Sequence, residues 1–260
     1  MLSPLLVAAV LAIGSLAPAT DAPWPMHDPN RPLPPLVDPG PAAPRPSAAP
    51  SDAIMLLGPG MDQLAWQSAW RSGSDEPRWT FIPDGGGAGV PVMRIAAGTG
   101  PLRTAIQHGD VQMRVEWRCP ADQGHRTGQN RGNSGVFLMS TYELQVLQSR
   151  ENETYADGMG GAIYGQFPPA VNAARPMGEW QAYDIVFRRP RFAADGSVEQ
   201  PARMTVHFNG VLVHDAVELI GPASHRTQRP YAPHADALPL ELQDHGEPIE
   251  FRSIWVRPLE

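Results

Sequence analysis

The sequence predicts an all-β fold, a β-sandwich of the jelly-roll type with one concave, polar sheet face. Several segments alternate apolar and polar residues with the period of a strand, and helical periodicity is nearly absent. Glycine and proline interrupt the pattern throughout, with 25 Gly and 30 Pro in 260 residues. Many short strands without intervening helices favour a sandwich or jelly roll.

Six segments carry the strand signal. Residues 111–118 alternate strictly between apolar and polar side chains. Residues 142–147 alternate as well, which places Glu143 and Gln145 on the face opposite the apolar side chains. Residues 202–208 and 211–214 flank Asn209-Gly210 and predict a hairpin. The remaining two expected strands cover residues 180–189 and 249–256.

Composition divides the chain into three parts. Residues 1–19 contain the apolar run Leu5–Leu16 followed by Ala-Pro-Ala, which predicts a signal peptide and export to the periplasm or the extracellular space. The run is too short for a membrane span. Residues 20–50 are rich in proline and predict a linker, or alternatively a strap across the domain. Residues 51–260 predict one domain, which is large enough to bury a substantial core.

Charge and residue usage exclude several classes of function. All 20 basic residues are arginines, so chemistry that requires a lysine is excluded. The single cysteine, Cys119, excludes an internal disulfide and a multi-cysteine metal site. The formal net charge of −7 argues against a nucleic-acid partner, because phosphates require a basic face.

Three clusters of residues could carry chemistry. The first, residues 131–148, joins two glycines to Glu143 and Gln145, and a carboxylate beside an amide suits a base, a metal ligand or a sugar clamp. The second, residues 240–247, places Asp244 and His245 in a loop, and histidine suits proton transfer. The third, residues 155–170, is a glycine-rich loop in which Tyr164 could stack on a sugar ring. A solvated strand face, a turn with a bystander histidine and a buried edge aromatic are the respective alternatives.

No motif predicts a cofactor. A calcium ion held by backbone carbonyls would leave no trace in a sequence, so the question of a divalent cation stays open. The chain also lacks the spaced carboxylates that jelly-roll glucanases use. A β-sandwich that binds a sugar on its concave face without such a carboxylate pair either uses another catalytic mechanism or binds the sugar without catalysis.

Several ordered stretches together resemble the bacterial 3-keto-disaccharide hydrolase domains, also described as 3-keto-glycoside hydrolases or lyases. The resemblance covers about residues 51–260, including the entry segment 50–54. It is carried by residues 132–138, 142–147, 154–158, 161–165, 178–184, 209–213 and 242–246.

The resemblance implies a concanavalin-like jelly roll that acts on a carbohydrate. It implies cleavage of 3-keto-glycosides by removal of the C2 proton, elimination and hydration, with the substrate supplied by a separate glycoside 3-dehydrogenase. It also implies a set of site residues. Glu143 or His245 would be the base, Asp244 would orient His245, Arg131 would hold the enolate, and Asn133, Gln145, Tyr164 and Gln243 would contact hydroxyl groups.

Two other functions fit the same sequence features. A non-catalytic carbohydrate-binding module would share the jelly roll and the concave face, and an ordinary glycosidase would need two carboxylates across a cleft. Two positions depart from the family pattern. Arg114 stands where many relatives carry a histidine, which would matter if that histidine is catalytic or binds a metal, and residues 56–60 replace a Phe-Asp-Gly turn.

Overall fold

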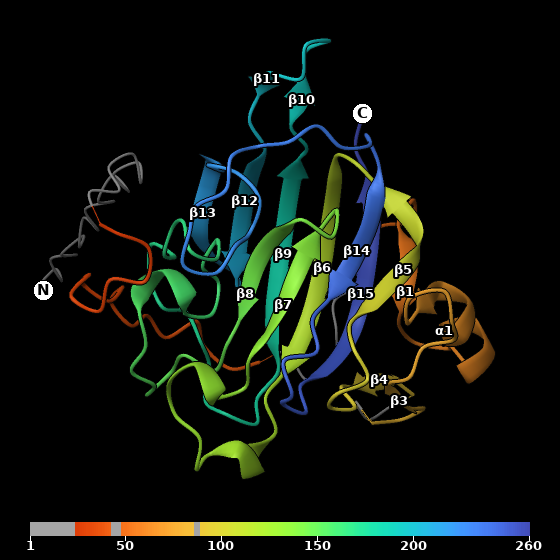
Figure 1. Cartoon of the computed structure of the whole chain (residues 1–260). Coiled ribbons are helices and arrows are strands. Elements are labelled where there is room, and N and C mark those ends of the chain that lie inside the picture. Colours follow the sequence, from red (N-terminus) through yellow and green to blue (C-terminus); the bar gives the residue numbers. More distant parts are fainter. Residues whose placement is uncertain (1–23, 43–47, 86–88) are drawn as a thin grey trace, which may run out of the picture.

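The computed structural model describes residues 24–42, 48–85 and 89–260. Within them, the strands form two antiparallel sheets that face each other (Figure 1). The larger sheet has eight strands, in the order β13-β12-β9-β6-β15-β4-β3, and β1 also pairs with β15. These strands are β1 (Ile54–Leu57), β3 (Thr80–Ile82), β4 (Val92–Arg94), β6 (Val111–Arg118), β9 (Gln181–Arg188), β12 (Arg203–Phe208), β13 (Val211–Glu218) and β15 (Glu250–Pro258).

The smaller sheet has five strands in the order β2-β5-β14-β7-β8, and it lies in front in Figure 1. A separate hairpin, β10 with β11, projects from one end of the sandwich (Figure 1). The five strands are β2 (Trp70–Arg71), β5 (Leu102–His108), β14 (Leu238–Leu242), β7 (Ser134–Leu138) and β8 (Tyr142–Val146), and the hairpin consists of β10 (Arg191–Phe192) and β11 (Val198–Gln200).

The structure confirms the predicted all-β jelly-roll class. Each of the six segments with a strand signal overlaps one strand, and β6 matches its predicted bounds, whereas β13 and β15 extend beyond theirs. The expected hairpin forms between β12 and β13, where Asn209 and Gly210 both have positive φ, as a turn of this kind requires.

The core lies between the two sheets. The apolar side chains of β6, which include Val111, Met113 and Val115, are fully buried. Trp117 packs against Tyr183 of β9 with ring centroids 5.7 Å apart. This alternation fixes which side chains face outward, because a shift of one residue would reverse every strand.

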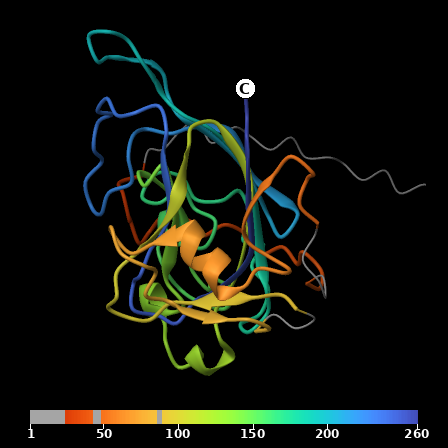
Figure 2. The same cartoon turned by 90° about the vertical axis from the view of Figure 1, so that its right-hand side faces the viewer.

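One edge of the sandwich is closed by the helix α1 (Gln63–Ala69) together with β3 and β4 (Figure 2). The Asp62 side chain accepts a hydrogen bond of 2.8 Å from the Ala65 amide and so caps the helix. Among the residues described here, no helix is long and apolar enough to cross a membrane.

The predicted signal peptide lies outside the described residues. The described residues 24–42, here called the N-terminal strap, lie against the domain. The amide of Val37 donates to the Asn172 carbonyl at 2.9 Å, and the Asn172 amide donates to the Pro35 carbonyl at the same distance. Farther along, the guanidinium of Arg175 donates to the Gly40 carbonyl at 3.0 Å.

Candidate functional site

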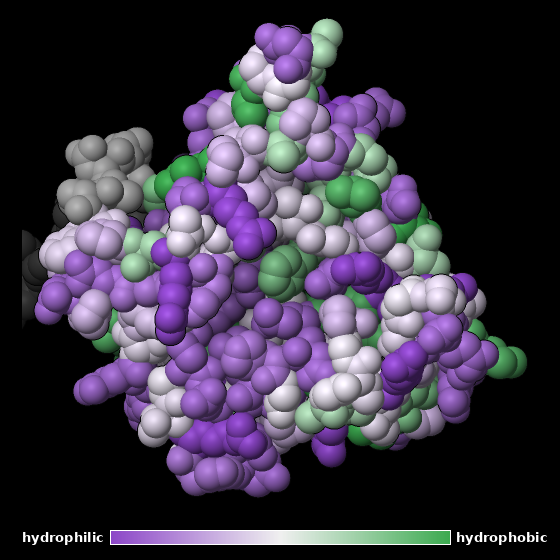
Figure 3. Space-filling model, viewed as in Figure 1, coloured by the Kyte–Doolittle hydropathy of each residue, from purple (hydrophilic) through white to green (hydrophobic). Residues whose placement is uncertain are grey.

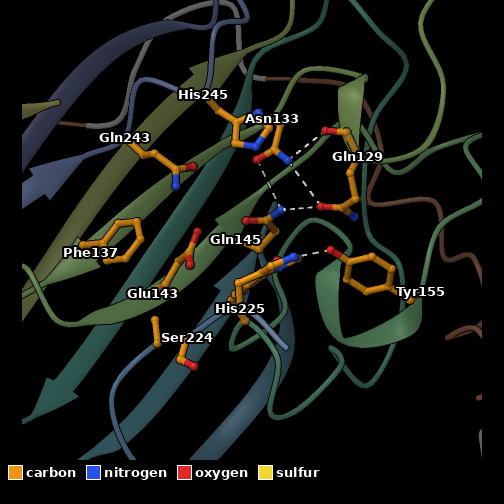
Figure 4. Close-up of a pocket in the computed structure, with 12 residues that line it drawn as sticks. Gln129, Asn133, Phe137, Glu143, Gln145, Tyr155, Ser224, His225, Gln243 and His245 are labelled. Carbon is orange, nitrogen blue, oxygen red and sulfur yellow. Dashed lines mark hydrogen bonds between the residues drawn. The ribbon is translucent and has the colours of Figure 1, made fainter. Parts of the chain in front are cut away.

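A cavity of about 500 Å³ opens on the outer face of the five-stranded sheet. Figure 3 shows a central hollow on this side of the molecule, surrounded mostly by hydrophilic side chains. Six of the eight residues expected from the sequence line the cavity: Asn133, Glu143, Gln145, Tyr164, Gln243 and His245. Its other lining residues are Gln129, Phe137, Tyr155, Ala223, Ser224 and His225 (Figure 4).

The pairing of β7 with β8 presents Glu143 and Gln145 to the cavity. In this register Gly135 lies opposite Gln145 and Phe137 lies opposite Glu143. A Cβ atom at Gly135 would lie 2.4 Å from the Glu143 Oε1 atom, so the missing side chain provides the space that the carboxyl occupies. Glycine is needed here for its small size rather than for its backbone freedom.

Glu143 is the one carboxylate that lines the cavity among the described residues. The residue is only 6% exposed, and the described part of the chain offers its carboxyl no hydrogen bond. Burial raises the pKa of Glu143 to about 8, and the negative charge of Glu241 acts in the same direction from β14, on the far side of β7. The carboxyl is therefore a much stronger base than an exposed one.

Three amide side chains form a network beside Glu143. The Asn133 side-chain nitrogen donates to the Gln129 carbonyl at 2.8 Å, and the Gln145 side-chain nitrogen donates to the Gln129 Oε1 atom at 3.2 Å (Figure 4). The Oε1 atoms of Gln145 and Gln243 are buried and find no partner among the described residues. The amide and hydroxyl groups that line this part of the cavity suit a ligand that forms hydrogen bonds, such as a sugar.

His245 lies at the rim of the cavity and is held by Glu247, not by Asp244. The Nδ1 atom of His245 lies 3.1 Å from the Glu247 Oε2 atom. This hydrogen bond raises the pKa of His245 and outweighs burial, which lowers it. Asp244 accepts instead from the backbone amides of Gly100 and Gly246, each at 3.0 Å. Asp244 was expected to orient His245, and the structure corrects this expectation, because the Asp244 carboxylate is bonded to backbone amides.

Arg131 was also expected at the site, but it is not among the residues that line the cavity. Its guanidinium donates to the backbone carbonyl of Glu151, in the loop after β8. Arg131 ends a short 3-10 turn, where its backbone points the side chain toward that loop. The expected contact between Arg131 and an enolate is therefore corrected.

Tyr155, Tyr164 and His225 form one wall of the cavity, here called the aromatic wall. The hydroxyl oxygens of Tyr155 and Tyr164 lie 3.2 Å apart, and the Tyr164 hydroxyl lies 3.1 Å from the His225 Nδ1 atom. Burial raises the pKa of both tyrosines, which remain neutral hydroxyls at physiological pH. Neutral hydroxyls can both donate to a ligand and accept from it.

Sequence reasoning missed five polar or aromatic lining residues: Gln129, Phe137, Tyr155, Ser224 and His225. Phe137 lies directly opposite Glu143 in the β7–β8 pair, so the pairing of these strands could have indicated it. Tyr155 lies in the glycine-rich loop 155–170, in which the sequence indicated only Tyr164 as a sugar contact. No pattern in the sequence indicates that the loop around His225 meets this loop.

No group of three or more His, Cys, Asp or Glu side chains in the described ranges is arranged to hold a metal ion. The polar side chains of the cavity are one carboxylate, several amides, two histidines and the hydroxyls of Tyr155, Tyr164 and Ser224. These groups suit hydrogen bonds to a polar organic ligand.

Arg114, the residue that departs from the family pattern, lies on the other sheet. Its guanidinium donates to both carboxylate oxygens of Asp184 at 2.7 Å and to Glu116 at 2.9 Å. Glu116 is buried and also accepts from Arg252 at 2.8 Å. Arg114 therefore belongs to an ion-pair network on the outer face of the eight-stranded sheet and does not line the cavity.

Comparisons with known proteins agree with this architecture. Residues 57–257 match the model of the 3-keto-alpha-glucoside-1,2-lyase-like domain. Two crystal structures of putative glycosyl hydrolases from Parabacteroides distasonis ATCC 8503 are similar to the chain. The first is 38% identical with a TM-score of 0.71, and the match covers 81% of this chain and 85% of the other.

The second is 18% identical with a TM-score of 0.49, and the match covers 74% of this chain and 89% of the other. No curated protein is significantly similar to the sequence. The family match extends from the end of β1 to the end of β15 and includes every residue that lines the cavity. The chain therefore belongs to the family of 3-keto-alpha-glucoside-1,2-lyase-like domains.

Proposed function

We propose that this protein is an exported enzyme that cleaves 3-keto-glycosides by elimination and hydration, with Glu143 as the base. The observation that carries the proposal is a buried, unpaired carboxyl that shares one cavity with an imidazole held by a buried glutamate. The family match and the similarity to glycosyl hydrolases support a carbohydrate substrate.

The reaction follows from the acidity that a ketone at C3 confers on the hydrogen at C2. Glu143 takes this proton, and the electrons of the C2–H bond form an enolate with the C3 oxygen. The enolate then collapses, the C1–O bond breaks, and the aglycone leaves as its alcohol after it accepts a proton. Water adds to C1 of the resulting enone and a proton returns to C2, so the net reaction is hydrolysis.

His245 fits the second role in this sequence, the stabilisation of the enolate oxygen. Glu247 favours the protonated imidazole, as the raised pKa of His245 indicates. A cation placed where negative charge develops stabilises the transition state more than the ground state. Asn133, Gln145, Gln243 and Tyr164 would bind the hydroxyl groups, and a separate glycoside 3-dehydrogenase would supply the 3-keto substrate.

The absence of a second carboxylate from the described lining argues against an ordinary glycosidase, which needs two across the bond. The rival function is a carbohydrate-binding module, and the aromatic lining favours it. Phe137, Tyr155 and Tyr164 offer ring faces on which a sugar could stack without reacting.

The test is a proton NMR time course in D₂O with a 3-keto-glucoside and, in parallel, the unoxidised glucoside. We expect cleavage of the keto compound alone, with deuterium at C2 of the product. Glu143→Gln should lower kcat by about 10²–10⁴-fold, as expected for the loss of a general base. Cleavage of the plain glucoside would refute the mechanism, and binding of both sugars without turnover of either would identify a binding module.

A further inference from the structure

The N-terminal strap passes directly behind the aromatic wall. The ring of His27 lies 4.1 Å from the ring of Tyr155, 5.1 Å from that of Tyr164 and 5.5 Å from that of His225, measured between centroids. All three neighbours line the cavity, whereas His27 does not. His27 therefore forms a second layer behind the wall.

His27 is fixed in this place by Asp157. The His27 amide donates to the Asp157 Oδ2 atom at 2.9 Å, and the His27 Nδ1 atom lies 3.3 Å from Oδ1. Burial alone would raise the pKa of Asp157, but the hydrogen bonds from His27 outweigh burial and lower it. The Asp157 carboxylate is therefore charged and committed to His27.

The backbone of His27 adds an independent observation. Its φ is 59°, in the left-handed region that non-glycine residues rarely adopt. Such a conformation persists where the surroundings hold it in place. The two hydrogen bonds to Asp157 and the close contact with the three rings supply that restraint.

We propose that His27 is a positioning residue of the ligand cavity, and that the strap holds Tyr155 and Tyr164 in the orientation in which they meet a sugar ring. The imidazole of His27, which packs at a tilt of 39° against the Tyr155 ring, restrains the orientation of Tyr155. The hydrogen bond between the two tyrosine hydroxyls restrains Tyr164 in turn. The hydrogen bond between Tyr164 and His225 extends the restraint to the third residue of the wall. The ligand class rests on the proposed function, whereas the ordering of the wall does not.

The ordering is tested without any ligand. The chain has five tyrosines, so protein labelled with 3-fluorotyrosine gives five ¹⁹F signals, which Tyr→Phe variants assign. His27→Asn removes the ring but keeps a residue that tolerates positive φ. We expect the signals of Tyr155 and Tyr164 to shift or broaden in this variant, while that of Tyr183, in the core, stays unchanged.

Two further variants make the test specific. His27→Phe keeps a ring against Tyr155 without the imidazole hydrogen bond, and it should restore most of the wild-type spectrum if the ring contact positions the wall. Leu36→Ser changes an exposed strap residue, 54% accessible, and should leave all five signals in place. Unchanged signals in His27→Asn, or equal changes in Leu36→Ser, would overturn the proposal.

The consequence for the ligand is measured on the full chain with the 3-keto-glucoside. His27→Asn should raise KM by roughly 2–12-fold, the range that one aromatic contact corresponds to, with kcat within about twofold. An unchanged KM together with a disturbed ¹⁹F spectrum would refute the role in binding. If wild-type protein turns over no substrate, the proposed function fails, and the ¹⁹F spectra still decide whether His27 orders the wall.

Discussion

Glu143 shows how one residue combines a cost to stability with a chemical capacity. The fold removes its carboxyl from water and gives it no hydrogen bond among the described residues, so its charged form is disfavoured. The same effect makes the carboxylate a strong base once it loses its proton. A structural role would require a partner for the carboxyl, and the structure provides an open cavity instead.

The first consequence is a dependence of stability on pH. The pKa of Glu143 is about 8 in the folded protein, against 4.5 for an ordinary glutamate, so between these values the folded state holds a proton that the unfolded state has released. The free energy of unfolding therefore falls as the pH rises from about 4.5 to about 8 and then becomes constant in this respect. Glu143→Gln removes this contribution.

Thermal unfolding of the wild-type protein and of Glu143→Gln at a series of pH values tests this expectation. The difference in Tm in favour of the variant should grow between pH 4.5 and 8, while other groups contribute equally to both proteins. A difference that is constant over this range would show that the carboxyl titrates normally.

The pair His245–Glu247 leads to a second prediction at this scale. Glu247→Gln should lower the pKa of His245, because the hydrogen bond and the charge of Glu247 both raise it. Asp244→Asn should lower it less, since Asp244 acts only through its charge and bonds to backbone amides. NMR titration of the imidazole signals measures both, and an equal effect of the two variants would restore Asp244 to the role expected from the sequence.

Among the elements, the strands whose two faces differ most could be predicted from the sequence. β6 and β8 alternate because one face packs in the core and the other does not, and this pattern placed Glu143 and Gln145 together correctly. β14 was not predicted, because it contains Pro239, a residue that interrupts the strand pattern. The helix α1 was missed as well, since seven residues cannot show a helical period.

The walls of the cavity could be predicted only in part. Residues on β7 and β8 are related by strand register, which local sequence indicates. The meeting of the loops around Tyr155, His225 and His245 depends on how the two sheets and their connections pack. The same limit explains why Glu247 holds His245 in place of the expected Asp244. Asp244 is adjacent to His245 in sequence, but its carboxylate accepts a hydrogen bond from the Gly246 amide in the turn.

The pair β7–β8 makes a prediction about Gly135. Gly135→Ala would place a methyl group 2.4 Å from the Glu143 Oε1 atom and 2.6 Å from the ring of Phe137. The carboxyl has to move, so we expect kcat to fall by at least about tenfold, since a misplaced catalytic group loses its alignment with the substrate. Circular dichroism would check the fold, and full activity would show that Glu143 does not act from this position.

For the molecule as a whole, the outer faces of the two sheets differ in the groups that they hold. The outer face of the five-stranded sheet holds the cavity, whereas that of the eight-stranded sheet holds the network of Arg114, Glu116, Asp184 and Arg252. The hydrophobic core lies between them. A change in the network should therefore alter stability without altering chemistry.

Arg114→Ala tests this separation. Loss of its hydrogen bonds to charged partners should lower the free energy of unfolding by about 1.5–3 kcal/mol, while kcat and KM for the keto sugar stay within twofold. Denaturant unfolding and steady-state kinetics on the same preparation supply both values. A large loss of activity in a folded variant would mean that the two faces are coupled.

The strap also bears on the order in which the molecule folds. Its contacts join residues 130 and 135 positions apart in the chain, as in the pairs His27–Asp157 and Arg175–Gly40. Contacts of such long range form late, because the intervening chain must first be ordered. The segment that is synthesised before the domain is consequently among the last to find its partners, and its amides should gain protection from hydrogen exchange only after those of the β12–β13 hairpin, whose partners are close in sequence.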